Sequence, residues 1–489
     1  GLVMIYFQRF YEKYRYGEDE KISDSFHEGI NILPFTANPA TSNFDNTCSI
    51  KGITGEFFRY NSQVPANPVL DYTTYIEEFV VNYLRQKELS KDGIEKFKLI
   101  MKDLMCTDGN FVPFNSSFLK YIPLDMVSKK GSPVLSKYGS GQKKLAEYLM
   151  SLIPNSSLNL KEEENRNVFC HTIQEALEQQ TQASPSKPET SYYVLPFIQQ
   201  QFVNDIKWLL QKKDYVVLKY IDMLLYFYAC YSITQTIFRL DAANKLNDSL
   251  ENPESLYFIL DNESASERRD VVKQGWATKL PSEYVSKLYG RMQAVDMLNI
   301  LLMDNENTKP IGLYKNLLDK IKETPFDYEI KNQCEKLLEY CKIGKYNALK
   351  KRTSGKKVDE IKVISDLSVN SYEDFFKKLE SICKSYQSFE YHGRMLSRVQ
   401  NLLKVRLLQT RRGRGFPVLV LDNDMLTFLI AMITREQRFK LKKLYQRFKE
   451  YGICFDLHTK QAIEAQLLKL NLLERRSDSG EAQYVRIIL

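Results

Sequence analysis

Hydrophobic residues recur at helical spacing through most of the chain, and this pattern predicts a mainly α-helical protein. Tyr72, Ile76 and Tyr83 form one such stripe, and Asp71 immediately before it is a suitable helix cap. Two short stretches, 55–60 and 363–367, look strand-like, and a lysine-rich loop is predicted at 345–357. Further periodic segments lie at 94–105, 142–152, 202–210, 215–240, 283–303, 313–321, 334–340, 372–388 and 393–409.

Two changes in composition suggest how these segments are grouped. Residues 179–190 (QQTQASPSKPET) are polar, contain Pro185 and Pro188, and lack a large apolar side chain, as is typical of a linker. The RRGRGFP stretch around Gly413 marks a second boundary. We therefore predict several domains: a mixed, mostly helical domain at 1–178, a linker at 179–190, a central α-helical domain at 191–410 and a C-terminal module at 411–489.

The pattern of the C-terminal module predicts a winged helix. A short apolar run at 416–421 leads to a first helix with a cap at Asp422–Asp424, and Gly452 ends a second helix. Asp456 then begins a third helix. Two β-type runs, 472–477 and 482–488, flank an Asp-Ser-Gly turn and predict a hairpin, the wing. The inner faces expected for the three helices are Met425, Phe428, Leu429 and Met432; Leu441, Leu444, Tyr445 and Phe448; and Ile463, Leu467 and Leu470.

The positive charge of the chain is concentrated in this same region. The 489 residues include 69 Lys and Arg against 61 Asp and Glu, a net charge of +8. Residues 391–489 hold 19 basic and 9 acidic residues, whereas the first 390 residues hold 50 and 52. The hydrophobic share of 43% and charged share of 27% exclude a disordered or collagen-like chain. The asymmetry favours a polyanion as the partner of the C-terminal region.

In a winged helix that reads DNA, the third helix enters the major groove and the wing touches the backbone. The candidate DNA-binding residues accordingly lie on a flexible arm, at the start of the second helix, on the outward face of the third helix and on the wing. They are Arg411, Arg412 and Arg414; Arg438, Lys440, Lys442 and Lys443; His458, Thr459, Lys460 and Gln461; and Arg475 and Arg476. Winged helices also dock proteins, and Asp456 and Glu464 dilute the charge of the third helix, so protein docking stays an alternative.

No motif predicts a catalytic residue, a cofactor or a bound metal. The GSGQKK stretch at 139–144 lacks the Lys-Ser/Thr ending of a phosphate-binding loop. The four histidines do not have the spacing of a zinc site. A metal-dependent nuclease is kept as an alternative, because Glu360 and Lys362 lie beside Asp359, although this triplet is common in a chain rich in lysine and glutamate. The protein is therefore expected not to be an enzyme.

One short segment combines aromatic and basic residues. Tyr11, Tyr14 and Tyr16 alternate with Lys13 and Arg15, an arrangement that a stacking platform for single-stranded nucleic acid would need. Most other aromatic residues fall on helical stripes and are predicted to be core.

The cysteines and the apolar segments indicate a compartment. Eight scattered cysteines form no CxxC pair, and Cys334 and Cys341, seven residues apart, are expected to be buried thiols in a reducing cytoplasm. The most apolar stretch, MLLYFYAC at 223–230, is shorter than the ~20 residues of a spanning helix. We therefore expect no membrane association and no signal peptide.

The C-terminal residues also resemble a known family. The ending LERRSDSGEAQYVRI, after RRGRGFPVLVLDND and the helix pair, resembles the DptG (DndG) family of bacterial DNA phosphorothioation-dependent restriction systems. The likeness is sharpest over roughly the last 80 residues. The resemblance implies an antiviral-defence role beside two ATPase-type partners, DptF and the helicase-like DptH. On that view the chain is a non-motor subunit that helps assemble the complex and hold double-stranded DNA; the alternatives are the nuclease above and a purely structural adaptor.

Overall fold

The structure, a computed structural model, is mainly helical, as the sequence predicts. It divides into two compact units: a first unit of residues 1–37, 190–198 and 230–489, and a second of residues 38–189 and 199–229. The residues that it describes are 4–17, 21–22, 32–36, 49–65, 69, 71–156, 158, 168–179, 185–247, 249–264, 269, 271, 285–303, 309–410, 417–476 and 483–489.

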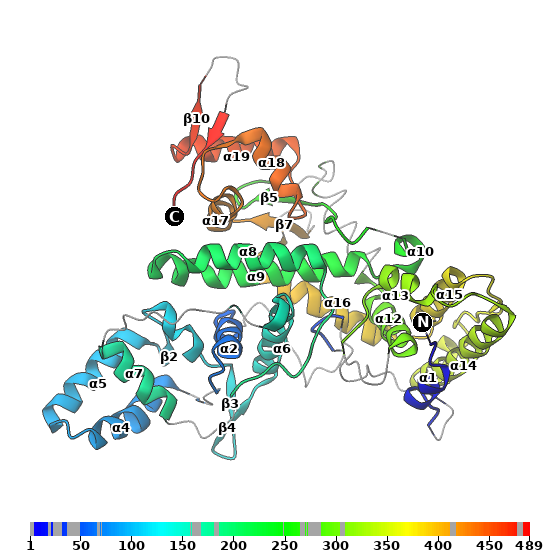
Figure 1. Cartoon of the computed structure of the whole chain (residues 1–489), viewed down its shortest axis with the longest axis horizontal. Coiled ribbons are helices and arrows are strands. Elements are labelled where there is room, and N and C mark those ends of the chain that lie inside the picture. Colours follow the sequence, from blue (N-terminus) through cyan, green and yellow to red (C-terminus); the bar gives the residue numbers. More distant parts are fainter. Residues whose placement is uncertain are drawn as a thin grey trace. The chain divides into compact units, whose positions relative to one another are not determined.

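The second unit contains mostly short helices and two small hairpins (Figure 1). Asp71 caps the helix that follows it, because its carboxylate accepts a hydrogen bond of 2.8 Å from the backbone N–H of Thr73. The elements of the second unit, in the part that the structure describes, are α2 (Lys51–Ser62), α3 (Tyr72–Tyr75), η1 (Ile76–Val80), α4 (Val81–Gln86), α5 (Lys91–Met105), β1 (Cys106–Thr107), β2 (Asn110–Phe111), η2 (Ser116–Tyr121), β3 (Met126–Lys129), β4 (Ser132–Leu135), α6 (Lys137–Ser151), η3 (Pro154–Ser156) and α7 (Val168–Gln179). The division between the units falls within α8 (Pro196–Leu210) and α9 (Asp214–Phe238).

The strand expected at 55–60 is wrong, because these residues belong to the buried helix α2. Gly52 and Gly55 allow close approach, since a side chain at Gly55 would collide with Ile122 and one at Gly52 with Gln142. Two glycines lower helix propensity in the sequence, but here they permit close packing against η2 and α6.

In the first unit, α12 is buried along its whole length and packs against α1, α13, α15 and α16. The helices before the C-terminal region, in the part of this unit that the structure describes, are α1 (Phe7–Lys13), α10 (Ala242–Lys245), α12 (Leu288–Leu302), α13 (Tyr314–Ile321), α14 (Tyr328–Arg352), η5 (Gly355–Lys357), α15 (Tyr372–Ser385) and α16 (Phe389–Lys404).

The lysine-rich loop predicted at 345–357 is wrong over its first half, because α14 continues to Arg352. Lys345 is fully buried, and its ammonium donates to Gln293 and, at 2.9 Å, to Gln387. Cys334 and Cys341 are both buried in α14 as predicted, and burial raises the pKa of Cys334 to about 12.

A four-stranded sheet in the first unit joins distant parts of the sequence. Its strands are β6 (Leu408–Thr410), β7 (Pro417–Leu421), β5 (Leu256–Leu260) and β9 (Ile453–Cys454), in that order. The strand β5 pairs in parallel with both β7 and β9, whereas β6 is antiparallel to β7. The side chains of Ile259, Val418 and Val420 pack together in its core. Residues 256–260 and 453–454 therefore fold as parts of one sheet.

After β7 the chain forms three helices and a second sheet (Figure 1). The helices are α17 (Asn423–Thr434), α18 (Leu441–Lys449) and α19 (Leu457–Lys469). The antiparallel sheet has the order β10-β11-β8, with β8 (Phe439–Lys440), β10 (Leu473–Arg475) and β11 (Gln483–Val485). The predicted inner positions are buried in α17 and, apart from the half-buried Tyr445, in α18, but Leu470 lies beyond the end of α19 and is 46% exposed, so its assignment to the core is wrong.

The helix α9 is 25 residues long and apolar enough, by length and composition alone, to cross a membrane. Of its most apolar window, 83% is buried inside the protein. Core helices of soluble proteins can have the same length and composition, so this helix is weak evidence for a membrane span. The sequence pattern underestimated this helix, because Asp222 and Lys219 interrupt its apolar run.

Candidate nucleic-acid interface

The N-terminus of α17, the first of the three C-terminal helices, is closed: an aspartate caps it, and an arginine holds that aspartate. Asp422 accepts a hydrogen bond of 2.8 Å from the backbone N–H of Met425, as the predicted cap. The guanidinium of Arg406 donates to both carboxylate oxygens of Asp422, at 2.7 and 3.0 Å. Partial burial alone would raise the pKa of Asp422, but these hydrogen bonds outweigh it and hold the pKa below its ordinary value. Both carboxylate oxygens therefore have hydrogen-bond donors within the protein.

The N-terminus of α19 is closed in the same way. Asp456 accepts from the backbone N–H of Thr459 at 2.9 Å, as the sequence predicts for a cap. Arg269 donates to both carboxylate oxygens of Asp456, at 2.7 and 2.8 Å. It also donates to the Thr459 hydroxyl at 2.8 Å and to Glu263 at 3.0 Å. We call Arg269, Glu263, Asp456 and Thr459 the Arg269 cluster.

The Arg269 cluster is well shielded from solvent: the side chains of Arg269 and Asp456 are 10% and 7% exposed. Burial alone would raise the pKa of Asp456, but the hydrogen bonds from Arg269 and Thr459 outweigh it and lower the pKa. Glu263 also accepts a backbone hydrogen bond of 2.6 Å from Leu260, the last residue of β5. The cluster therefore attaches the start of α19 to the four-stranded sheet.

The Arg269 cluster contradicts the prediction for one of the four residues expected on the outer face of α19. Thr459 is fully buried and its hydroxyl is held by Arg269, so the prediction that it faces outward is wrong. His458 and Gln461 are exposed, and Lys460 is half-buried with its ammonium 5.2 Å from the centre of the Tyr445 ring. The outer side of α19 thus offers only three of the four predicted side chains.

The N-terminus of α18 is different from the other two. Its cap position is Lys440, no side chain caps the first turn, and no acidic residue lies in that turn. Lys440, Lys442 and Lys443 are all exposed, and none forms an ion pair with a described residue. Lys443 also lies over the Phe439 ring at 5.1 Å. The helix therefore presents unpaired backbone N–H groups among three positive charges, an arrangement suited to binding a phosphate.

The hairpin places further cations beside this helix end, because β8 leads directly into α18 and pairs with β11. Arg438 stacks on the ring of Tyr484 with its guanidinium 3.9 Å from the ring centre, and pairs with Glu474 at 3.0 Å. Arg475 pairs with Glu464 at 2.7 Å, and Arg476 is exposed. Arg438 and Arg475 are therefore each paired with a glutamate, whereas Arg476 is exposed.

The remaining predicted contacts, Arg411, Arg412 and Arg414, lie outside the described residues. No sequence signal indicates Arg269 or Glu263, because each is more than 180 residues from Asp456 along the chain. Acidic and basic residues are common in this chain, so no local pattern distinguishes these two from solvated charges.

The alternative of a metal-dependent nuclease at Glu360 and Lys362 has little support in the structure. Glu360, Lys362 and Asp359 are exposed, and the expected strand at 363–367 is not formed. In the described ranges, no group of three or more His, Cys, Asp or Glu residues is placed to hold a metal ion. The GSGQKK residues belong to helix α6, whose N-terminus is capped by Ser136, rather than to a loop.

Comparison with known proteins does not add to this description. No protein-family model matches the chain, and no curated protein matches it.

Proposed function

We propose that residues 417–489 form a winged helix that holds double-stranded DNA through its phosphates. The order of helices and strands, with a three-stranded sheet of β8, β10 and β11, supports this fold. The observation that carries the function is the open N-terminus of α18, surrounded by Lys440, Lys442 and Lys443.

The contrast between helix ends supports phosphate contacts over base reading. In a DNA-reading winged helix, the N-terminal residues of the third helix reach base edges. Here the start of α19 is closed by Asp456 and Arg269, whereas the start of α18 is open and cationic. Phosphate contacts position a protein on DNA but carry no sequence information. We therefore propose DNA binding that is independent of sequence.

On this proposal the chain is a non-motor assembly subunit of a cytoplasmic DNA phosphorothioation-dependent restriction complex. The resemblance of its C-terminal residues to the DptG family supports this placement, with DptF-like and DptH-like ATPases as partners. The helical body would bind these partner proteins while the winged helix holds DNA. No residue is assigned to the recognition of sulfur-modified linkages.

The experiment is a salt titration of duplex binding by the full chain, because the sheet joins residues 453–454 to 256–260 and the C-terminal module is not a separate piece. The test variant is Lys440→Glu/Lys442→Glu/Lys443→Glu. The control, Lys91→Glu/Lys129→Glu/Lys137→Glu, makes the same charge change at exposed positions of the second unit.

We expect the test variant to bind at least ~10-fold more weakly in low salt. Its slope of log affinity against log salt should flatten by roughly 2–3, because each neutralised phosphate contributes ~0.9 to that slope. The control should keep most of the affinity and the slope. Equal reductions in affinity in the two variants, or no binding by the wild-type chain, would contradict the proposal.

A second candidate function is protein docking by α19. Leu457 and Leu468 are 69% and 36% exposed on this helix, and apolar side chains at the surface favour a protein partner over DNA. A Leu457→Ser/Leu468→Ser variant that keeps DNA binding but no longer co-purifies with the ATPase partners would assign docking to this face. Loss of both properties would point to misfolding, which circular dichroism would detect.

A further inference from the structure

Two groups of cationic side chains lie among the helices of the first unit, and the first group lines a cavity beside α14. The segment after α1 lies against this helix, where the hydroxyl of Tyr16 donates to the carbonyl of Tyr340 at 2.6 Å. A side chain at Gly344 would collide with Ile22 and Tyr16, so glycine permits the close approach of the segment. Tyr14 is buried, so the expected stacking platform of exposed tyrosines is wrong.

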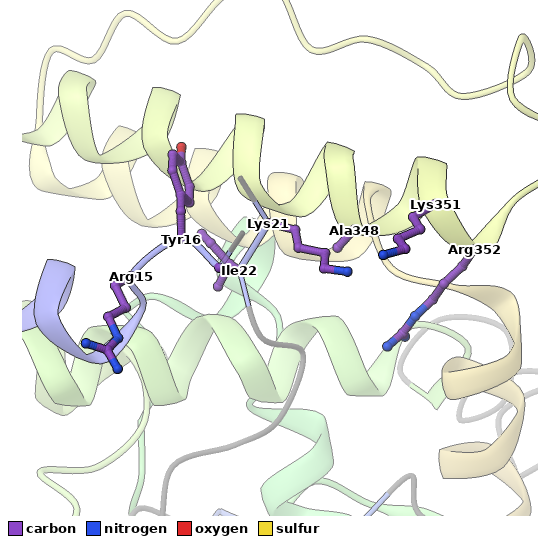
Figure 2. Close-up of a pocket in the computed structure, with 8 residues that line it drawn as sticks. Arg15, Tyr16, Lys21, Ile22, Ala348, Lys351 and Arg352 are labelled. Atoms are coloured by element: carbon purple, nitrogen blue, oxygen red, sulfur yellow. The ribbon is translucent and has the colours of Figure 1, made fainter. Parts of the chain in front are cut away.

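The cavity beside α14 has a volume of about 400 Å³, and Figure 2 shows the side chains that line it. Its cationic lining residues are Arg15, Lys21, Lys351 and Arg352. Lys21, Lys351 and Arg352 each have an interaction partner within the protein. Because their charge is already engaged, we assign no ligand to this cavity.

The second group of cations surrounds the N-terminus of α12, a helix of 15 residues. Lys287 is at the cap position, no side chain caps the first turn, and that turn contains no acidic residue. A side chain at Gly290 would collide with the backbone of Cys383 and Lys384, so the first turn of α12 packs directly against the last turn of α15. The positive end of a helix dipole therefore lies at Lys287.

Arg291, one turn after Lys287, is a buried arginine without a partner. It is 7% exposed, and its Nε and Nη1 atoms have no hydrogen-bond acceptor in the part of the chain that the structure describes. Helical side chains lean toward the N-terminus of their own helix, so its guanidinium is directed to the end where Lys287 lies. Burial, together with the charges of Lys384 and Arg291, lowers the pKa of the Lys287 ammonium, which agrees with this proximity.

The acidic residues nearest to Arg291 are engaged elsewhere. Glu380, on α15, accepts from the Lys384 ammonium at 3.0 Å and from the backbone N–H of Ala242 at 2.6 Å. Asp296, further along α12, accepts from the Tyr14 hydroxyl at 2.7 Å. Lys287 forms no ion pair with a described residue. The charges of Lys287 and Arg291 are therefore uncompensated among the described residues.

His392, on α16, reports the same excess of positive charge. Burial lowers its pKa to about 4, and the charges of Lys287, Lys345 and Arg291 act in the same direction. Its Nδ1 atom is also buried without a hydrogen-bond partner among the described residues. The surroundings of Arg291 therefore disfavour a further cation and favour an anion.

One member of the group has a simpler explanation. Cations stabilise the last turn of a helix, where backbone carbonyls carry partial negative charge, and Lys384 lies in the last turn of α15. This explanation does not extend to Arg291, because its Nε and Nη1 atoms donate to no carbonyl of a described residue.

We propose that the N-terminus of α12 binds one phosphate-sized oxyanion, held by the guanidinium of Arg291 and the ammonium of Lys287. An arginine fork and the positive end of a helix are groups that proteins use to bind phosphate. The burial of Arg291 favours a small ligand, either free phosphate or a small phosphomonoester. No bond is broken in this proposal, which does not depend on DNA binding by α18.

The test is calorimetric titration of the full chain with inorganic phosphate and with glycerol 3-phosphate, after dialysis into buffer without phosphate. The test variant is Arg291→Met. Its control, Arg398→Met, makes the same change at an arginine of α16 that is 6% exposed and has a partner within the protein. Each titration is repeated in the Lys440→Glu/Lys442→Glu/Lys443→Glu background, because α18 is itself proposed to contact phosphates.

We expect one phosphate to bind each chain at α12, with at least ~10-fold weaker binding in Arg291→Met and a change of less than ~3-fold in Arg398→Met. Phosphate should raise the unfolding temperature of the wild-type chain but not that of Arg291→Met. Without phosphate, Arg291→Met should unfold no earlier than the wild-type chain, because it removes a buried charge that lacks a partner. Glycerol 3-phosphate that binds more tightly than phosphate would assign the site to a phosphomonoester, and weaker binding would assign it to free phosphate.

A milder pair of variants keeps the test decisive if Arg398→Met does not fold. Lys287→Gln, at an exposed position, should weaken phosphate binding several-fold. Lys336→Gln, an exposed position of α14 without an ion pair to a described residue, should leave it unchanged.

Three results would overturn the proposal: no phosphate binding by the wild-type chain, equal weakening in Arg291→Met and Arg398→Met, or a lower unfolding temperature in both Arg291→Met and Glu283→Gln without phosphate. Glu283 lies outside the described residues, four positions before Lys287, and the third result would identify it as the partner of Arg291. Loss of all phosphate binding in the α18 background would also overturn the α12 site while leaving the DNA-binding proposal intact.

Discussion

The N-termini of α18 and α19 lie within 20 residues of each other in sequence and are built in opposite ways. The first turn of α19 is closed by Asp456, which Arg269 holds with two hydrogen bonds. The first turn of α18 has no side-chain cap and a lysine at the cap position. A capped helix end is more stable, whereas an uncapped end with cations nearby can bind an anion. On the proposed function, the capped end holds α19 in place, whereas the uncapped end of α18 is the one that contacts a phosphate.

The largest effect should come from removing Arg269, which holds the capping carboxylate at the N-terminus of α19. Arg269→Met leaves the carboxylates of Asp456 and Glu263 buried without their partner, and should lower the free energy of unfolding of this region by about 3 kcal/mol. Hydrogen exchange of the amides of residues 457–460 measures the local destabilisation. The control, Arg475→Met, breaks an exposed pair with Glu464 and should cost less than about 1 kcal/mol. Equal effects would mean that the Arg269 cluster is not a specific support.

Acidification should destabilise the N-terminus of α19 less strongly than Arg269→Met does. The pKa of Asp456 is lower in the folded protein than in the unfolded chain, so its contribution to stability is fully present above the ordinary carboxyl pKa of ~3.9. It is lost as the pH falls through the lower folded value. Protection of the first turn of α19 should therefore decline only below that ordinary value, and Asp456→Asn should remove this decline. An acid dependence that persists in Asp456→Asn would assign it to another group.

Adding a cap to the N-terminus of α18 should have a smaller effect, which raises the stability of the helix and lowers its affinity for DNA. Lys440 has extended backbone at the cap position of α18, a conformation in which aspartate can cap. Lys440→Asp should therefore stabilise α18 by about 0.5–1 kcal/mol. It should also reduce duplex affinity by several-fold, because it replaces a cation with a carboxylate where the phosphate is expected. Lys440→Ala removes the charge without adding a cap; if it weakened DNA binding as much, the cap itself would not matter.

The smallest effect should follow changes on the outer face of α19. His458→Ala/Gln461→Ala removes two exposed side chains that base reading would need, and we expect duplex affinity to change by less than ~3-fold for any sequence. A winged helix that reads bases through α19 would instead lose ~1–3 kcal/mol per contact at particular sequences. Binding to duplexes of different sequence distinguishes the two results.

Local features of the C-terminal region could be predicted from sequence. The caps Asp422 and Asp456, the break at Gly452 and the apolar stripes of α17 and α18 depend on residues within one or two turns, and the structure confirms them. The pairing of β9 with β5, about 200 residues away, could not be predicted, because a two-residue strand has no periodicity of its own. The burial of Thr459 could not be predicted either, because its hydroxyl is held by Arg269, a second contact between residues far apart in the sequence.

The cationic sites show the same limit. The excess of positive charge near the C-terminus can be read from the sequence, and Lys440, Lys442 and Lys443 at the start of α18 are close together along the chain. The cavity lined by Arg15 and Arg352 joins residues more than 300 positions apart. The predicted loop at 345–357 missed the last turns of α14, which supply Ala348, Lys351 and Arg352 to its lining. Only the tertiary contacts of Tyr16 and Gly344 bring these charges together.

The most direct test of the central claim compares the two helix ends in one experiment. Hydrogen exchange of the full chain, with and without a short duplex in low salt, reports on the amides of residues 441–444 and 457–460 separately. Binding of phosphates at the open end predicts slower exchange at 441–444 and little change at 457–460. Protection confined to 457–460, or to neither segment while the duplex is bound, would contradict it.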